Sequence, residues 1–395
     1  MNAETNHIRV ARFVLGLSLS FWLFSASICE GVTAPSAVTE SGALEEHFVA
    51  QPSEVSVEVW VDNLNIPWSL VFLPDGRALV SERSGQVRLI SEGVLQEKPY
   101  AEPGALHYGE GGLMGLASHP KFPEEPYIYA MHTYRKEGNV YNRVIRLTDL
   151  GDEGILDKVI IDEIPGGRNH NGGRIAFGPD GMLYVTTGET FKAELAQDLS
   201  SLGGKILRIS PEGDIPRDNP FPDSPIYSYG HRNPQGLAWH PETQDLFASE
   251  HGPSGEFFKL AHDEINVVVK GGNYGWPEVI GRGNKNPYID PLIVWKETTP
   301  PGGITFYRGG LFVATLKSNA LLRIKMKRTG NHSYVVEEIE RWFAEDYSRG
   351  RFGRIRDVVV GPDGYLYFLT SNRDGRGRPR PNDDKVYRIV WQEPQ

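Results

Sequence analysis

One pattern recurs six times between Val55 and Val390: an apolar run, a tight polar turn, and a second run rich in Val, Tyr and Phe. The clearest copies are LVFLPDGRALVSE, IAFGPDGMLYVTT and VVVGPDGYLYFLT, centred on Asp75, Asp180 and Asp363. Weaker copies are centred on Phe122, Thr243 and Gly309. The centres lie roughly 45 to 65 residues apart, which is the period expected for a four-stranded sheet rather than for a helix pair.

This period predicts an all-β fold, namely a six-bladed β-propeller with four-stranded antiparallel blades around a central channel. Alternating segments such as Arg143–Leu147 and Lys385–Val390 follow the hairpins and are typical of half-buried strands. The predicted blades run from about 55–105, 106–160, 161–215, 216–290, 291–345 and 346–393. Polar loop residues at the mouth of the channel are then the best candidates for binding or catalysis.

The charge and cysteine content exclude several classes of function. The chain has 41 basic and 51 acidic side chains, a formal charge of −10, and no long basic stripe. A nucleic-acid partner is therefore not expected. Cys29 is the single cysteine, so the folded domain has no disulfide framework and no cysteine metal site.

The N-terminus has the features of an export signal. Arg9 and Arg12 precede an apolar stretch over 13–23, and small residues follow it in FSASICEG. We expect a signal peptide over 1–30 and a periplasmic or secreted protein with no stable membrane insertion beyond the signal. An uncleaved anchor or a lipidated Cys29 are the alternatives. Residues 31–54 are polar without periodicity and predict a disordered tether before the propeller domain at 55–393.

Two polar clusters precede the inner strands of neighbouring copies. In GGRNHNGGRIAF, a neutral imidazole at His170 is suited to take a proton from an alcohol, with Arg174 nearby. In YSYGHRNPQGLAWHP, Arg232 carries a fixed charge that can polarise a carbonyl, and Asn233 adds a directional donor. The alternatives are a loop histidine without a role and a structural hydrogen-bond network between blades.

A third cluster, over 249–276, contains oxygen donors suited to calcium. The bend at Gly252 and Pro253 turns carbonyls outward, and Asp263, Glu264 and Asn266 add side-chain oxygens. Calcium favours such mixtures of carbonyl and carboxylate, although acidic residues beside a turn are more often simply solvated.

A fourth cluster is basic. Arg354 and Arg356 alternate and point to the same side of a strand, while Lys317 follows Leu316 in the preceding copy. Together with Arg232 they predict a positive channel mouth in an acidic protein, which is suited to a compact, multiply anionic ligand.

The combined motifs resemble one family, the soluble aldose sugar dehydrogenases that use pyrroloquinoline quinone (PQQ) and are related to soluble glucose dehydrogenase. The resemblance rests on NIPWSLVFLPDGR, GEGGLMGLASHP, GHRNPQGL, EHGP, DEIN, KGGNYGWP, LKS and RIRDVVVGPDG. It implies PQQ- and calcium-dependent oxidation of the anomeric hydroxyl of aldose sugars to lactones, with hydride passing to the quinone and electrons to an external acceptor. A monomer or homodimer is expected.

The resemblance also implies residue roles. His170 would be the base, and Arg232 would polarise the accepting carbonyl. The carbonyls of Gly252 and Pro253 would bind the calcium at the cofactor, and Glu264 and the Tyr274 carbonyl would bind a second, structural calcium. The implied cofactor contacts are Glu110, Asn233, Asp263, Leu316, Lys317, Arg354 and Arg356.

Three departures from the family pattern are visible. Glu110 stands where a glutamine is expected, Asn169 stands where the glucose enzyme has an aspartate, and 255–262 carries additional residues. The alternative functions are a sugar- or protein-binding propeller without redox activity and a calcium-dependent lactonase.

Overall fold

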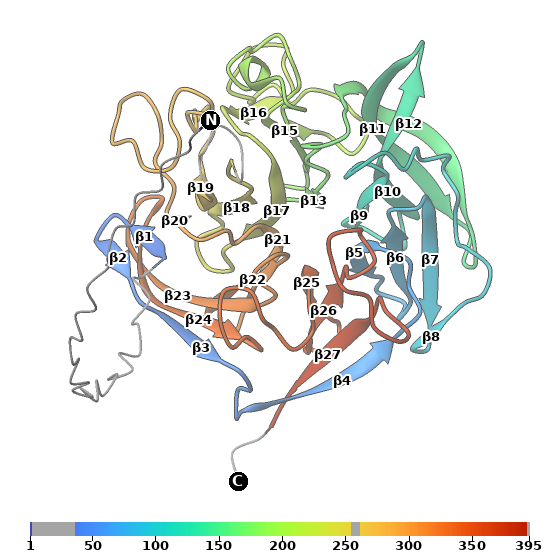
Figure 1. The fold of residues 1–395 in the computed structure, drawn as a ribbon. Coiled ribbons are helices and arrows are strands. Elements are labelled where there is room, and N and C mark those ends of the chain that lie inside the picture. The colour runs from blue at the N-terminus through green and yellow to red at the C-terminus, as the bar shows by residue number, and fades with distance from the viewer. Residues whose placement is uncertain (2–35, 254–260, 393–395) are drawn as a thin grey trace. The chain divides into compact units, whose positions relative to one another are not determined.

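The computed structural model describes residues 1, 36–253 and 261–392. Their regular secondary structure is almost entirely β-strand, and the strands form six sheets arranged around a central axis (Figure 1). The first strand of each sheet lies nearest the axis, and the later strands lie farther out. The predicted six-bladed propeller is therefore confirmed.

Within the described residues, each of the first three blades contains four strands that are consecutive along the chain. The first blade contains β5 (Pro67–Phe72), β6 (Ala78–Glu82), β7 (Gln86–Ser91) and β8 (Val94–Leu95). The second contains β9 (Leu113–Ser118), β10 (Tyr127–Lys136), β11 (Asn139–Asp149) and β12 (Gly154–Pro165). The third contains β13 (Ile175–Phe177), β14 (Leu183–Thr187), the 3-10 helix η1 (Ala193–Ala196), β15 (Lys205–Ile209) and β16 (Ile226–Tyr229).

The last three blades each receive strands from the N-terminal segment. The fourth contains β17 (Pro234–Trp239), β18 (Leu246–Glu250), β19 (Asp263–Val268) and β20 (Ile293–Trp295), followed by β1 (Ala37–Thr39) and β2 (Gly42–Leu44). The fifth contains β21 (Pro301–Tyr307), β22 (Gly310–Thr315), β23 (Leu321–Gly330) and β24 (Ser333–Trp342), followed by β3 (Glu46–Val49). The sixth contains β25 (Ile355–Val360), β26 (Leu366–Thr370), β27 (Val386–Trp391) and β4 (Val55–Val61).

The ring closes where β4 pairs with β27. The pairing is antiparallel and places Val55 opposite Trp391 and Val61 opposite Val386. The first blade therefore begins at Pro67, and the prediction that it begins at residue 55 was wrong. Local pattern identifies a strand but not its partner, because every sheet edge offers the same row of N–H and C=O groups.

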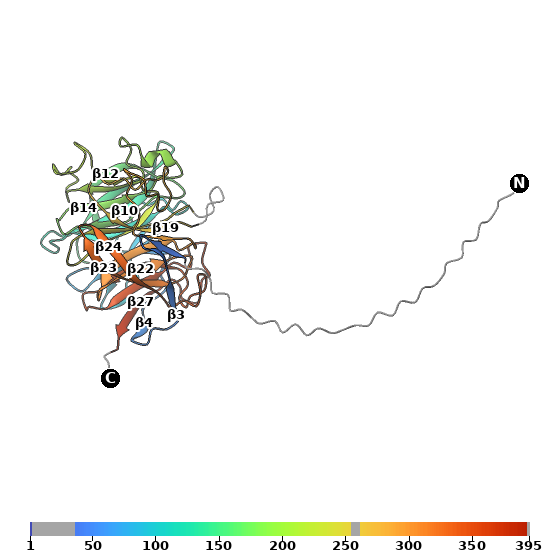
Figure 2. The ribbon, with the colours of Figure 1, turned by 90° about the vertical axis from the view of Figure 1, so that its left-hand side faces the viewer.

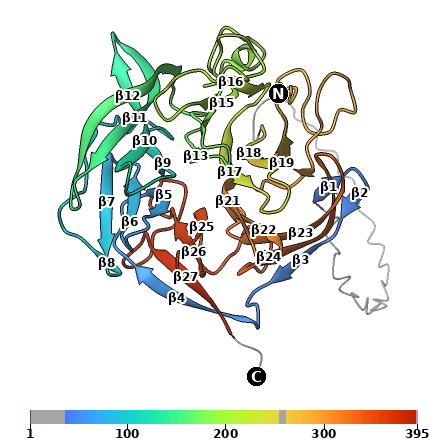
Figure 3. The ribbon, with the colours of Figure 1, turned by 180° about the vertical axis from the view of Figure 1, so that it is seen from behind.

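The segment expected to be a disordered tether forms strands over residues 37–49. β1 pairs with β20 and β3 runs parallel to β24, so this segment follows the outer edges of the fourth and fifth blades (Figures 2 and 3). The buried carboxylate of Glu46 accepts hydrogen bonds from Arg341 Nε at 2.8 Å and Trp295 Nε1 at 3.0 Å. These tertiary contacts stabilise the strands, and the prediction of disorder was wrong here.

The predicted signal peptide lies, apart from Met1, outside the described residues, as do residues 31–35 of the predicted tether. No helix in the described parts of the chain is long and apolar enough to cross a membrane.

Local chemistry explains the hairpins and the packing. The glycines of the Pro-Asp-Gly turns, Gly76, Gly181 and Gly364, have φ values of 91°, 74° and 78°, which only glycine adopts without strain. Apolar side chains fill the space between neighbouring blades, as where Met131 of β10 packs in one cluster with Val185 of β14. Rigid blades packed in this way hold the loops at the channel mouth in place.

Candidate active site

Polar residues reach one mouth of the channel from two recurring positions, the loop before the first strand of a blade and the loop after its second strand. Both positions lie at the same end of a blade, because the first strand of an antiparallel pair begins where the second ends. The first position supplies Glu110, His170, Arg232 and Arg354. The second position supplies Arg83, Glu189, His251, Lys317 and Asp374.

A cavity of about 400 Å³ lies at this mouth. Its walls include eight of the predicted residues: Glu110, His170, Arg232, Gly252, Asp263, Leu316, Lys317 and Arg354. An adjoining cavity of about 210 Å³ shares Glu110, Leu316 and Arg354 with the first and adds Arg356. Asn233 lines neither of these cavities. The described fold thus brings most of the predicted site together from five blades.

His170 is held rigidly beside the larger cavity. Its Nδ1 contacts a carboxylate oxygen of Glu189, which lies just after β14 and is buried. Its main-chain N–H donates to Glu110 Oε2 at 3.2 Å, and its φ is +53°. The ring of Phe191 lies 4.1 Å from the imidazole, centroid to centroid. The Glu189 contact fixes the orientation of the imidazole ring beside the cavity.

Glu189 was not predicted from the sequence. The signal was available, because an acidic residue also ends or follows the second strand in the first and fourth blades, as Glu82 and Glu250. Neither its pairing with His170 nor its burial could be read from that position alone.

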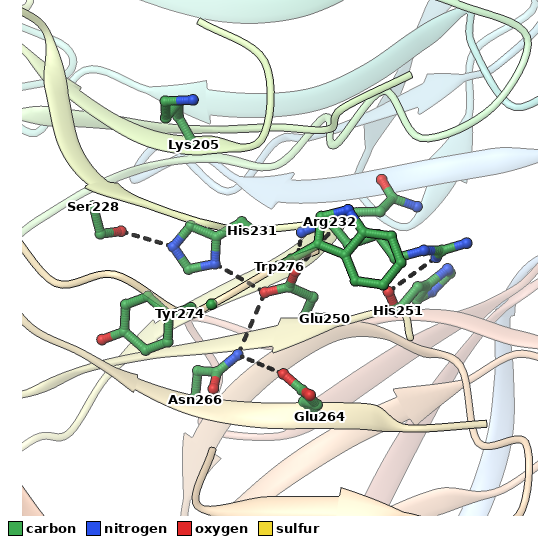
Figure 4. Close-up of polar contacts among 12 residues, drawn as sticks. Lys205, Ser228, His231, Arg232, Glu250, His251, Glu264, Asn266, Tyr274 and Trp276 are labelled. Carbon is green, nitrogen blue, oxygen red and sulfur yellow. Dashed lines mark hydrogen bonds and ion pairs between the residues drawn. The ribbon is translucent and has the colours of Figure 1, made fainter. Parts of the chain in front are cut away.

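Arg232 is buried and is oriented by main-chain and aromatic contacts. Its Nη1 donates to the carbonyl of His251 at 3.1 Å, and its guanidinium lies 5.4 Å from the centre of a Trp276 ring. Its main-chain N–H donates to the Glu250 carboxylate (Figure 4). Because a guanidinium keeps its charge at all relevant pH values, Arg232 provides a fixed positive charge beside the cavity.

Asn233 lies behind the cavity wall. Its Oδ1 accepts from the main-chain N–H of Gly172 and from Gln235 Nε2, both at 3.0 Å. Gln235 lines the 210 Å³ cavity and accepts a hydrogen bond from Arg356 Nη1 at 2.9 Å. In the described structure Asn233 therefore supports wall residues, consistent with the structural network considered from the sequence. Arg174 lines neither the 400 Å³ nor the 210 Å³ cavity. It forms an ion pair with Asp357 at 2.9 Å.

Asp263 is a buried carboxylate in the wall. It accepts from the main-chain N–H groups of Gly252 at 3.0 Å and Thr299 at 2.7 Å. Burial raises the pKa of Asp263 to about 6, against the lowering effect of these N–H groups and of Arg232 and Lys317. Lys317 is exposed, so its ammonium group is available at the mouth.

The base of the site is rich in guanidinium groups. Arg354 pairs with Asp374 at 2.8 Å, and Arg83, which was not predicted, donates from Nη2 to the Asp374 carbonyl at 3.2 Å. Burial lowers the pKa of Arg356 to about 9. The 210 Å³ cavity is lined by five arginines and two carboxylates, so this region carries an excess of positive charge, as the sequence predicted.

Glu110, the departure noted from the sequence, forms an ion pair with Arg376 at 2.7 Å. Burial acts to raise the pKa of Glu110, but Arg376, His251 and His170 lower it to about 2. The side chain is therefore ionised at neutral pH. Arg376 was not predicted, because it lies in the loop after β26, 266 positions along the chain from Glu110.

Another cavity, of about 20 Å³, lies beside the 400 Å³ cavity and is lined by Gly252, Pro253, Glu264 and Tyr274. Glu264 faces Glu250 across the pairing of β18 and β19. Burial and the charge of Glu250 raise the pKa of Glu264 well above its usual range. Asn266 was predicted to offer an oxygen, but its Nδ2 points to both carboxylates at 3.4 Å (Figure 4).

The described residues contain no cluster of three or more His, Cys, Asp or Glu side chains suited to a metal ion. The expected calcium ligands are largely main-chain carbonyls, which such a cluster does not include. Most of the additional stretch at 255–262 lies outside the described residues.

The model of the glucose/sorbosone dehydrogenase family matches residues 64–379 of the chain. The aldose sugar dehydrogenase YliI of Escherichia coli is 34% identical over 361 residues, which cover 82% of this chain and 92% of the relative.

Two solved structures are also similar. One from Thermus thermophilus is 53% identical, has a TM-score of 0.80 and covers 85% of this chain and 100% of its own. The PQQ-bound aldose sugar dehydrogenase of Streptomyces coelicolor is 38% identical, has a TM-score of 0.75 and covers 86% and 99%, respectively.

Proposed function

The chain belongs to the glucose/sorbosone dehydrogenase family, and from this we propose that it is a PQQ- and calcium-dependent oxidoreductase that converts aldose sugars to lactones. The observation that carries the proposal is that His170, Arg232, Lys317 and Arg354 line one cavity. A proton acceptor and several cations in one site suit the oxidation of an alcohol beside an anionic cofactor.

The residues present fit PQQ. The cofactor is a flat polycarboxylate, and Lys317, Arg354 and Arg356 place cations around the two adjoining cavities. Among the described residues, the buried Nε atoms of Arg83 and Arg356 have no hydrogen-bond partner, so donors remain for a ligand. When bound, the quinone would supply the two-electron acceptor, since no side chain performs that chemistry.

His170 would receive the proton of the anomeric hydroxyl at Nε2. The buried Glu189 carboxylate keeps the proton of the neutral ring on Nδ1, and it stabilises the imidazolium once the second proton arrives. Arg232 would hold its positive charge beside the developing oxyanion.

The donor set also fits calcium. Gly252 lines both the 400 Å³ and the 20 Å³ cavities, and Glu264 and Tyr274 line the 20 Å³ cavity. A space of about one water molecule between two acidic side chains suits a small cation, because a cation would offset their mutual repulsion. Gly252 and Pro253 would hold the calcium near the cofactor, and Glu264 and Tyr274 would hold the structural one.

Reconstitution tests the proposal. Purified protein mixed with calcium and PQQ is expected to shift the absorption spectrum of the cofactor and to reduce a dye only when an aldose is present. Samples without PQQ and samples treated with a calcium chelator are the controls. Folded protein that neither changes the PQQ spectrum nor reduces the dye would contradict the proposal.

The same samples separate the alternatives. A binding propeller would bind sugar in calorimetry without binding PQQ. A lactonase would hydrolyse lactones in the absence of PQQ, whereas we expect hydrolysis to be absent.

We also propose export to the periplasm or the medium, with electrons passing to an external acceptor. The basic and apolar N-terminal sequence supports export. Fractionation of cells expressing the full chain tests it, and a cytoplasmic, full-length product would contradict it.

A further inference from the structure

The ion pair between Glu110 and Arg376 joins loops of the second and sixth blades across the mouth of the channel. Arg376 Nη1 lies 2.7 Å from Glu110 Oε1, and the two residues are 266 positions apart in the chain. Both line the 400 Å³ cavity. The pair therefore forms part of the wall of the proposed cofactor site.

Glu110 also holds the segment that carries His170. Its Oε2 accepts from the His170 main-chain N–H at 3.2 Å, and its own N–H donates to the carbonyl of Arg168 at 2.7 Å. Both hydrogen bonds lie on the N-terminal side of the His170 Cα, and His170 itself has a φ of +53°. A non-glycine residue keeps such a conformation only when its surroundings stabilise it.

Arg376 is itself held in place. Its main-chain N–H donates to Asp374 Oδ1 at 2.9 Å, and Asp374 pairs with Arg354. A chain of contacts thus runs from Arg354 through Asp374 and Arg376 to Glu110, and from Glu110 to the backbone of His170.

The charge of Glu110 needs a counterion in this place. The carboxylate is ionised at neutral pH and lines a cavity for which we propose a polyanionic guest. Repulsion between like charges is strong in a partly buried site, because the effective dielectric constant is low. Arg376 supplies the opposite charge at hydrogen-bonding distance.

We propose that Arg376 is a positioning residue that fixes His170 through Glu110 and at the same time offsets the Glu110 charge toward the cofactor. The second part rests on the proposed function. The first part concerns the cofactor-free protein and can be tested on its own.

Hydrogen exchange in the cofactor-free protein tests the positioning role. We expect exchange of the 168–171 segment to be about threefold or more faster in Arg376→Gln and in Glu110→Ala, in line with the free energy of a partly exposed ion pair. Glu110→Gln is also expected to exchange faster than the wild type, because its single amide oxygen can accept from the His170 N–H or from Arg376 but not from both. Wild-type exchange in Arg376→Gln would overturn the positioning role.

Titration with PQQ tests the compensation of charge. We expect Arg376→Gln to raise the Kd of PQQ about tenfold, since it leaves the carboxylate facing the anion. Glu110→Gln should bind at least as tightly as the wild type, and the double variant should bind close to the wild type. A double variant as weak as Arg376→Gln would overturn the compensation.

Arg378→Gln is the matched control, because this exposed arginine lies in the same loop and makes no ion pair among the described residues. It should behave as the wild type in both experiments, and a change equal to that of Arg376→Gln would overturn the inference. A wild-type protein that binds no PQQ would contradict the proposed function, while the exchange measurement would still decide the positioning role.

Discussion

The imidazole of His170 and the carboxylate of Glu189 form a direct side-chain contact through Nδ1. Both side chains are buried, and they come from the two ends of the hairpin that begins the third blade. The contact orients the imidazole and favours the tautomer that carries its proton on Nδ1, next to the carboxylate.

This contact predicts that Glu189→Gln lowers kcat by roughly 10- to 100-fold, the usual effect of losing a residue that orients a functional histidine. The Kd of PQQ is expected to remain unchanged. Steady-state kinetics of the reconstituted protein would measure the effect. Glu194→Gln is the control, because Glu194 is an exposed carboxylate in the neighbouring 3-10 helix. Equal losses in the two variants would contradict the assigned role.

His170→Ala should lower kcat by roughly 100- to 10,000-fold, because general-base assistance contributes that much to a rate. The variant should still bind PQQ, since the cations around the cavity remain. Turnover is followed by dye reduction and binding by the cofactor spectrum. Full activity in this variant would exclude His170 as the base.

Lys317→Met is expected to raise the Kd of PQQ by roughly 10- to 100-fold, which corresponds to losing a hydrogen bond to a charged group. The difference in Kd between Lys317→Met and the wild type should shrink at high salt, because Lys317 is exposed and its charge is screened. Titrations at two ionic strengths measure both effects. Lys327→Met, an exposed lysine of β23, should bind as the wild type.

Glu46→Ala should lower the free energy of unfolding by about 3–5 kcal/mol, because it leaves Arg341 buried without its partner. Denaturant titration measures the change. The neighbouring Glu45 is exposed, so Glu45→Ala should change stability by less than about 0.5 kcal/mol. Equal stability of the two variants would show that the N-terminal strands contribute little to the propeller.

Because His132 is buried, we predict that the folded protein loses stability in acid. Its Nδ1 donates to the Thr133 carbonyl at 3.1 Å and its Nε2 accepts from Arg143 Nε at 3.0 Å, so the buried ring is neutral. Burial lowers the pKa of His132 from 6.5 to about 4. The contribution of the neutral His132 to the free energy of unfolding is complete above pH 6.5. It is lost as the pH falls toward 4, because the unfolded chain then binds a proton that the folded chain excludes.

The loss attributable to His132 is about 3 kcal/mol between pH 7 and pH 4. Denaturant titrations across this range should show a smaller decrease in His132→Gln than in the wild type. The exposed His47 is the control, and His47→Gln should follow the wild-type curve. Parallel curves for all three proteins would contradict the prediction.

Much of the site was predictable because its residues occupy repeated positions. His170, Arg232 and Arg354 each precede the first strand of a blade, and equivalent places in a repeat meet at one mouth. Glu189 and Arg376 were missed because a charged side chain near a strand end has many possible partners. The nearest partner is known only when the blades are assembled.

The sequence by itself determined the number of blades, the hairpin turns and the positive character of the channel mouth, because these depend on local periodicity, on glycine in turns and on residue type. Only the tertiary structure decided which strand closes the ring and which charges pair. Val55 meets Trp391, Glu46 meets Arg341 and Glu110 meets Arg376, although the members of each pair are at least 266 positions apart in the chain. Such pairings depend on the relative placement of distant segments, which local propensity does not encode.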